Sequence, residues 1–565
     1  MIEYESVHPL DNGWVDRRTF LTAAGALVAV WPASLLAAPE TLYNGIRLTT
    51  PWPPVRRGFQ PAPLTAPYLI DRPEVVPIDV GRQLFVDDFL IEQTSLEREF
   101  HRPDYHPANP ILRPTTAWEK YDEYAVRTHT RSNPTAIPFS DGVFYDPADR
   151  LFKMWYMGGY TQNTCIAFSH DGIIWEKPAL DVVRGTNIAV AHRNRDSSTV
   201  WLDLNERDRS RRYKMAVYHD HYLLLFASAD GIHWRPLGRG SQTGDRTTFF
   251  YNPFRKIWVF SIRADGPVGR IRRYWEGRDF ERAAAWAEDQ PVPWTAADAA
   301  DPERPGYNVP TELYNLDCVA YESVLLGLFT IFRGERNDRE KPNEVCVGFS
   351  RDGFHWDRPD RRPFLPVSER VGDWNWANVQ SAGGCCLVVG DRLYFYCSGR
   401  RGVPGSNDPG VCSTGLATLR RDGFASMTHP PPASGVQRLE PSPGPGTLVT
   451  RPLTFSGRYL FVNLDAPDGE LRVEVLDREG RVVPGYAADH AVPVRGDATR
   501  ARVTWTGAAD LGAVAGRPVR FRFTLRRGRL YAFWVSSSTS GASQGYVAAG
   551  GPGFSGLTDT AGDRA

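Results

Sequence analysis

Five acidic residues stand beside short apolar runs that are rich in aromatic and β-branched residues. They are Asp196, Asp245, Asp317, Glu322 and Asp373. Two carboxyl groups on opposite sides of an acetal can cleave it: a protonated one assists the leaving oxygen, and an ionised one acts as nucleophile or base. These residue types therefore indicate acid–base chemistry, if the fold brings at least two of them together.

The sequence around these residues suggests different roles. Glu322 lies in the apolar stretch 319–328, where burial disfavours the charged form of a carboxyl group. We therefore interpret Glu322 as the proton donor, Asp196 as nucleophile or base, and Asp245 as a residue that orients the substrate. The alternative for each Asp is a structural hydrogen bond in a turn or between repeats.

A second set of residues could contact a substrate. They are Arg127, His129, Arg131, Arg272, Asp317, Trp374 and Trp376. The first three alternate, which would place them on one face of a strand, and guanidinium groups bind hydroxyl or carboxylate oxygens. The tryptophans offer flat faces to sugar rings. A solvated charged surface is the alternative for the basic row.

The elements that would position these residues follow from an internal repeat. The pattern Ser-x-Asp-Gly-x-x-Trp occurs around Asp171, Asp230 and Asp352. The first two are 59 residues apart and the next interval is 122 residues, so one copy is missing between them. A degraded copy at Asp279 and another at Asp422 bring the number of units to five.

Each unit also has a similar interior. Phe144-Tyr145-Asp146-Pro147 precedes Phe152 to Tyr156, and Phe250-Tyr251-Asn252-Pro253 precedes Trp258-Val259-Phe260. Short aromatic runs that are separated by Asp-Pro or Asn-Pro turns predict antiparallel strands. Five four-stranded units predict a five-bladed β-propeller, whose radial arrangement leaves only short edges exposed. We expect Leu84-Phe85-Val86 to close the ring from the N-terminal side.

The propeller explains why the acidic residues could meet. The first strand of each blade lines the central channel, so residues that precede those strands come from different blades to one place. The acids of the repeated boxes are interpreted differently. Asp171, Asp230 and Asp352 precede Gly in tight turns, where an Asp accepts backbone N–H bonds.

Several of these segments also resemble a known group. Gln83 to Ile91, His106 to Leu112, the Lys-Met-Trp-Tyr strand and the boxes are similar to bacterial proteins labelled glycoside hydrolase family 32-like. This resemblance, over about Gly81 to Met427, implies a five-bladed glycosidase of the clan that includes invertases, arabinanases and β-xylosidases. The Trp-Met-Asn-Asp-Pro-Asn-Gly, Arg-Asp-Pro and Glu-Cys signatures of invertases are absent, so the resemblance does not imply fructosidase activity.

The N-terminus predicts export. Asp16-Arg17-Arg18-Thr19-Phe20-Leu21 leads into the apolar stretch Thr22 to Trp31 and then Ala37-Ala38-Pro39, the layout of a twin-arginine signal. The alternative is a short hydrophobic helix after two arginines. The stretch is shorter than the roughly 18 residues of a membrane span, so we expect a periplasmic or extracellular protein without one.

After Met427 the composition changes. A Pro- and Gly-rich linker precedes alternating strands such as Leu471 to Val475, which predict a β-sandwich. The expected organisation is a signal peptide (1–38), an extended segment (39–80), the propeller (81–428), the linker (429–446), the sandwich (447–536) and a disordered tail (537–565). The fold class is thus all-β.

Composition narrows the function. The 66 basic and 66 acidic residues balance, which argues against a nucleic-acid partner. The seven cysteines form no recognisable metal-ligand spacing, and we expect no cofactor, with a structural calcium ion left open. Two hypotheses remain: an exported glycoside hydrolase that acts on an oligo- or polysaccharide, and a carbohydrate-binding propeller without catalysis. Oligomeric state, sugar and linkage stay open.

Overall fold

The computed structural model describes residues 39–55, 59, 62–128, 131–336, 338–429 and 444–560. All its helices and strands belong to the compact unit Glu40–Ala565. The predicted signal peptide (1–38), His129 and most of the predicted linker lie outside the described residues. Within the described residues, no helix is long and apolar enough to cross a membrane.

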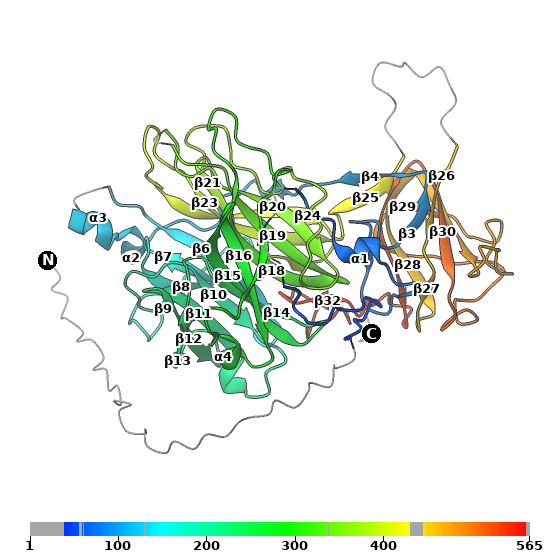
Figure 1. The fold of residues 1–565 in the computed structure, drawn as a ribbon, viewed down its shortest axis with the longest axis horizontal. Helices are drawn as coiled ribbons and strands as arrows, with labels where there is room; N and C mark the ends of the chain where they lie inside the picture. The colour runs from blue at the N-terminus through cyan, green and yellow to red at the C-terminus, as the bar shows by residue number, and fades with distance from the viewer. Residues whose placement is uncertain are drawn as a thin grey trace. The chain divides into compact units, whose positions relative to one another are not determined.

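Five sheets form a five-bladed β-propeller, as the repeats predicted (Figure 1). Blade 1 contains β6 (Ala136–Asp146), β7 (Leu151–Gly158), β8 (Asn163–Ser169) and β9 (Ile188–Val190). Blade 2 contains β10 (Ser198–Leu202), β11 (Tyr213–His219), β12 (Tyr222–Ser228) and β13 (Trp234–Gln242). Blade 3 contains β14 (Thr248–Asn252), β15 (Ile257–Gly266), β16 (Gly269–Gly277) and β17 (Val292–Ala296). Blade 4 contains β18 (Glu312–Glu322), β19 (Val324–Phe332), β20 (Glu344–Ser350) and β32 (Tyr546–Val547). Blade 5 contains β21 (Asn378–Ser381), β22 (Leu387–Val389), β23 (Arg392–Arg400), β24 (Cys412–Arg420) and β5 (Asp104–Tyr105).

The repeated boxes form turns that link neighbouring blades. The Asp230 carboxylate accepts the backbone N–H groups of Ile232 and His233 at 2.8 and 2.9 Å, and Gly231 has a φ of 80°. A side chain at Gly231 would collide with the Trp155 ring of blade 1, whose indole N–H donates to the Gly231 carbonyl at 2.7 Å. The prediction that the box Asp accepts backbone N–H bonds in a tight turn is confirmed for Asp230.

The degraded box keeps its acid in a capping role. Asp279 precedes the short helix α4 (Phe280–Ala283) and accepts the Arg282 N–H at 2.9 Å. It thereby satisfies one of the free N–H groups at the start of this helix.

The ring is closed by an N-terminal strand, although not by the predicted one. β5 pairs with β24, with Tyr105 opposite Ala417, and so completes blade 5. The prediction for Leu84 to Val86 is wrong, because β2 (Gln83–Leu84) pairs with β31 (Arg529–Ser536) of the second domain.

The second domain is the predicted β-sandwich, which also takes strands from the N-terminal part of the chain. Its main sheet has the order β3-β26-β30-β28-β31-β25-β4, with β29 paired to β28, and β1 pairs with β27 in a small parallel sheet. The remaining bounds are β1 (Val76–Pro77), β3 (Ile91–Thr94), β4 (Glu97–Phe100), β25 (Ala425–Thr428), β26 (Gly446–Thr450), β27 (Leu453–Thr454), β28 (Tyr459–Leu476), β29 (Val494–Arg502) and β30 (Arg520–Arg526). The short helices are α1 (Pro67–Ile70), α2 (Ala117–Lys120), α3 (Glu123–Thr128) and η1 (Arg209–Arg211).

The C-terminal tail differs from the expected disorder. Residues 537–560 are described, and β32 pairs with the end of β18. The next residues contact three blades: Ala548 N–H donates to Ala320 of blade 4, Tyr145 N–H of blade 1 donates to Ala549, and Val388 N–H of blade 5 donates to Gly550. The tail therefore crosses the propeller axis at the end where β18 finishes.

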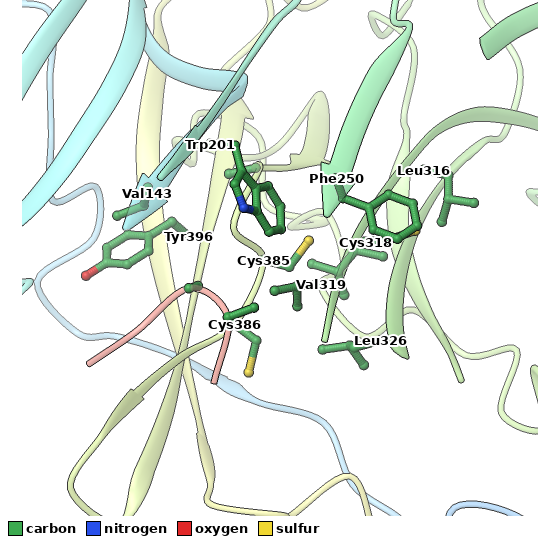
Figure 2. Close-up of a cluster of buried hydrophobic side chains, with 14 of the residues drawn as sticks. Val143, Trp201, Phe250, Leu316, Cys318, Val319, Leu326, Cys385, Cys386 and Tyr396 are labelled. Atoms are coloured by element: carbon green, nitrogen blue, oxygen red, sulfur yellow. The ribbon is translucent and has the colours of Figure 1, made fainter. Parts of the chain in front are cut away.

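Apolar side chains fill this half of the channel. Figure 2 shows buried residues that come together from all five blades. They include Val143, Trp201, Phe250, Leu316, Cys318, Val319, Leu326, Cys385, Cys386 and Tyr396. The innermost strands of the blades begin at the other end of the channel.

Candidate active site

Two carboxylates from adjacent blades stand at the end of the channel where the innermost strands begin. Asp196 lies just before β10 and Asp245 just before β14, and both are half-buried. Asp196 is fixed by its backbone N–H, which donates to the Tyr218 carbonyl at 3.3 Å, and its carboxylate accepts the Ser197 N–H at 2.7 Å. The predicted approach of Asp196 and Asp245 agrees with this arrangement.

The surroundings of Asp196 favour its protonated form. Burial raises the pKa of Asp196, and the nearby Asp245 carboxylate raises it further, whereas Arg246 and Arg400 act in the opposite direction. Asp245 has a cation beside it, since the Arg263 guanidinium lies 3.4 Å from its Oδ1. The two acids thus have different electrostatic environments.

Arg246 interacts electrostatically with both acids and with Asp317. It has a φ of 61° and is fully buried, with its guanidinium 3.9 Å from the centre of the Phe139 ring. It donates to the Phe139 carbonyl at 3.3 Å and to the Ser140 hydroxyl at 3.1 Å. Burial lowers the pKa of Arg246, and Asp317 is the first of the anionic groups that oppose this. Arg246 therefore supplies a positive charge between blades 1 and 3.

Asp317 belongs to the channel floor and is only 3% exposed. Its Oδ2 accepts hydrogen bonds from Asn315 at 2.8 Å, Ser140 at 3.1 Å and Ser381 at 2.5 Å, which come from blades 4, 1 and 5. Burial raises the pKa of Asp317. This residue links blades beneath the site, so its predicted contact with substrate does not fit its burial.

Arg272 is a supporting residue as well. It is fully buried and donates to the backbone carbonyl groups of Arg246, at 2.6 Å, and of Tyr314. It therefore stabilises the turn that carries Arg246, and the prediction that it binds substrate does not match these contacts.

Glu340 and Arg400 are site residues that the sequence did not reveal. Arg400, at the end of β23, donates to Glu340 Oε1 at 2.7 Å, while Oε2 of Glu340 is buried and has no hydrogen-bond partner among the described residues. Burial raises the pKa of Glu340, and Arg400 opposes this shift. Glu340 lies in the connection between β19 and β20 rather than before an inner strand, so the rule used for the other acids could not select it.

Glu322 is not part of this group. It ends β18, five residues after Asp317, or roughly 16 Å at the rise of an extended strand. Its carboxylate accepts hydrogen bonds from Arg421 at 3.0 Å, Ser543 at 2.7 Å and the Arg82 N–H at 3.1 Å. The predicted convergence of Glu322 with Asp196 and Asp245 is therefore wrong, because its buried charge is compensated at the opposite end of the blade.

The two tryptophans pack inside blade 5. A side chain at Gly399 or Gly415 would collide with Trp374, and Trp376 is buried with the Arg339 guanidinium 5.0 Å from its ring centre. These faces are occupied, so neither ring is the open sugar platform that we predicted.

The predicted basic row is not a strand. Arg127 lies in the helix α3 and His129 outside the described residues, whereas Arg131 is exposed in the segment that leads to β6. The alternation of the three residues therefore does not place them on one face.

A cavity of about 450 Å³ reaches Gly244, the residue before Asp245, but neither Asp245 nor Asp196 lines it. Arg263, which contacts Asp245, also lines this cavity, together with His221, Gln242 and Trp286. Its size lies in the ordinary range of small-molecule sites, about 300–1,000 Å³. Within the described part of the chain, no three His, Cys, Asp or Glu residues gather as metal ligands would.

Comparisons with known proteins give likeness of fold only. No family model matches the chain, and no curated protein matches it. Among solved structures, an N-acetylgalactosamine deacetylase from F. plautii is 13% identical with a TM-score of 0.40, covering 58% of this chain and 97% of its own. A thermostable family-43 glycoside hydrolase is 12% identical with a TM-score of 0.36, covering 56% and 99%. A β-fructofuranosidase from Schwanniomyces occidentalis is 11% identical with a TM-score of 0.34, covering 77% and 97%. Likenesses of this size assign neither a family nor an activity to this chain.

Proposed function

We propose that this chain is an exported glycoside hydrolase in which Asp196 and Asp245 are the two catalytic carboxyl groups. The observation that carries the proposal is the approach of two half-buried carboxylates from adjacent blades, where the charge of Asp245 raises the pKa of Asp196. A carboxyl group that stays protonated beside an ionised one is the combination that glycoside cleavage needs.

The roles differ from those in the sequence interpretation. Asp196 donates its proton to the leaving oxygen, because burial and the Asp245 charge both favour its neutral form. Asp245, beside Arg263, serves as nucleophile or as the base that activates water. Arg263 also lines the neighbouring cavity, and we infer that part of the substrate occupies it.

Arg246 and Arg400 limit the negative charge of the site. Both act to lower the pKa of Asp196, so they keep its proton available for transfer. Glu340 positions Arg400 through their 2.7 Å hydrogen bond, and Asp317 balances Arg246 from below. The resulting group contains cations and carboxylates close to balance, as suits an uncharged glycosidic bond.

Export is the second part of the proposal. It rests on the Arg17-Arg18 pair, the apolar stretch after it and the small residues before Pro39. The test is a fusion of residues 1–45 to a reporter that is active only after export. Arg17→Lys with Arg18→Lys should abolish reporter activity, and reporter activity that is unchanged by this double substitution would contradict the prediction.

Activity is tested by screening the purified protein against nitrophenyl furanosides and pyranosides, and against plant and algal polysaccharides. We expect release of reducing sugar or nitrophenol from at least one of them, and loss of this release in Asp245→Asn. Glycan binding without any turnover, unchanged in Asp245→Asn, would instead support the carbohydrate-binding propeller without catalysis.

A further inference from the structure

A second cavity, of about 390 Å³, lies where blades 1 and 5 meet. Its wall comes from the segment before β6 and from the connection between β23 and β24. Hydrogen bonds join these two segments: the Cys412 N–H donates to the Pro134 carbonyl at 2.9 Å, and the Gly410 N–H donates to Asn133 Oδ1 at 3.1 Å. The cavity is thus part of a fixed junction.

The charged side chains that line this cavity are all positive. Among the described residues that line it, the only charged ones are Arg131 and Arg401, and both are exposed. Within the described residues, neither guanidinium group forms an ion pair or a hydrogen bond. Neighbouring arginines differ: Arg400 pairs with Glu340 at 2.7 Å, and Arg339 with Glu369 at 2.8 Å.

Small and apolar groups surround the two guanidinium groups. The Arg401 Nη2 lies 3.9 Å from the position that a Cβ would have at Gly372, and Val371, Val403 and Pro134 also line the cavity. The apolar C–H face of a sugar ring can pack on such residues, while an anionic substituent of the sugar reaches the arginines.

The cavity is also close to the candidate active site. Arg401 follows Arg400 directly, and Arg400 lies in the channel beside Glu340. Successive residues of an extended chain point in opposite directions, so one short segment presents a cation to the channel and another to the cavity. A glycan chain that occupies the channel can therefore place a neighbouring unit in the cavity.

We propose that this cavity is a subsite for an anionic sugar, and that the glycan this protein recognises carries carboxylate or sulfate groups. The inference rests on the proposed function, because it names the substrate class of the same site. Guanidinium groups bind both kinds of oxyanion through paired N–H donors, so the shared chemistry is a sugar with an oxyanion substituent.

The test is isothermal titration calorimetry on the full chain with three tetrasaccharides. They are oligogalacturonate, a sulfated galactan and the neutral galactan of the same length. The variants are Arg131→Gln, Arg401→Gln and their combination. Arg207→Gln, at an exposed arginine without an ion pair among the described residues, is the matched control. The measured quantity is binding affinity, which does not require that the glycan be hydrolysed.

We expect one of the anionic tetrasaccharides to bind more tightly than the neutral one, and its affinity to fall about tenfold or more in the double variant, as expected for lost charge-assisted hydrogen bonds. The control should bind as the unaltered protein does. The oligogalacturonate and the sulfated galactan separate a carboxylate from a sulfate preference. Equal binding of all three glycans, or anionic binding that the double variant retains, would overturn the proposal. If the protein nevertheless hydrolyses a neutral glycan under the same conditions, the proposed glycosidase function stands and only the anionic subsite is rejected.

Discussion

The charge of Asp245 acts on Asp196, although the two residues are separated by a whole blade in the sequence. Asp196 precedes β10 and Asp245 precedes β14, and the ring brings both to the end of the channel where the innermost strands begin. The Asp245 carboxylate raises the pKa of Asp196 in addition to the effect of burial. This relationship is the basis for assigning Asp196 as the proton donor. It should also lower the stability of the folded protein by a measurable amount.

Asp196→Asn should stabilise the fold while it removes activity. A carboxyl group whose pKa is raised in the folded state binds more protons there than in the unfolded state, so it reduces stability as the pH rises above the ordinary aspartate value. Asparagine removes this cost. We expect the melting temperature of Asp196→Asn to exceed that of the unaltered protein by about 1–3 °C at pH 7.

The comparison is a series of melting curves between pH 3 and pH 8. The difference should disappear at the acidic end, where Asp196 is protonated in both states. Asp468→Asn, at an exposed position, is the control and should show no such trend. A variant that is less stable than the unaltered protein at neutral pH would mean that ionised Asp196 is itself stabilised by its surroundings.

Glu322→Gln should destabilise the fold and leave turnover by the folded protein unchanged. Glu322 compensates Arg82 and Arg421 in a fully buried cluster, and removal of one partner of a buried pair typically costs about 3–5 kcal/mol. The measurement is urea unfolding together with kcat at a temperature where the variant is folded. Glu312→Gln, at the half-buried start of the same strand, should cost less than about 1 kcal/mol. Loss of kcat in folded Glu322→Gln would return this residue to the catalytic candidates.

The C-terminal tail should be required for a stable propeller. A chain that ends at Ser536 lacks β32 and the Asp559 carboxylate, which lies 2.7 Å from Arg421, and it uncovers apolar residues at the axis. We expect a lower melting temperature and increased binding of a hydrophobic dye. A chain that ends at Thr560 is the control and should melt as the full chain does. Equal melting of the Ser536 and Thr560 chains would show that the tail is only a surface addition.

Asp230→Ala should lower stability by on the order of 1 kcal/mol, because two backbone N–H groups lose their acceptor in the turn. Its kcat should stay unchanged, since this turn lies outside the channel group. Thermal unfolding and steady-state rates measure the two effects. A stable variant with reduced kcat would show that the box has a functional role.

The sequence was sufficient to predict the five-bladed ring. It was not sufficient to predict which strand closes the ring or that the C-terminal tail is ordered. The spacing of Asp171, Asp230 and Asp352 predicted the blades, because each box forms the same local turn. The closing strand was chosen incorrectly because β2 and β5 are both short, and only tertiary contacts decide which sheet each one joins. The tail was wrongly predicted to be disordered because it is rich in small residues. Gly551 has to be small, since a side chain there would lie 1.7 Å from the Val388 carbonyl.

The candidate site was predicted only in part, because some of its features depend on local sequence and others on tertiary contacts. Position before an inner strand is a local property, and it selected Asp196 and Asp245, whose charges influence each other in the structure. The charge of Glu322 did require an explanation, but its partners Arg82 and Arg421 are 240 and 99 residues away. Arg246 and Arg400 likewise gain their roles from blades that only the closed ring brings together.

The most direct test of the proposed roles compares two substrates that differ only in their leaving group. With the sugar identified by the screen, turnover of its dinitrophenyl glycoside and of its alkyl glycoside is measured for the unaltered protein, Asp196→Asn and Asp245→Asn. A dinitrophenolate leaves without protonation, so Asp196→Asn should retain most of the bond-cleavage rate on that substrate and lose about 10²–10⁴-fold on the alkyl glycoside. Asp245→Asn should lose activity on both. Equal losses on the two substrates in Asp196→Asn would contradict its assignment as the proton donor.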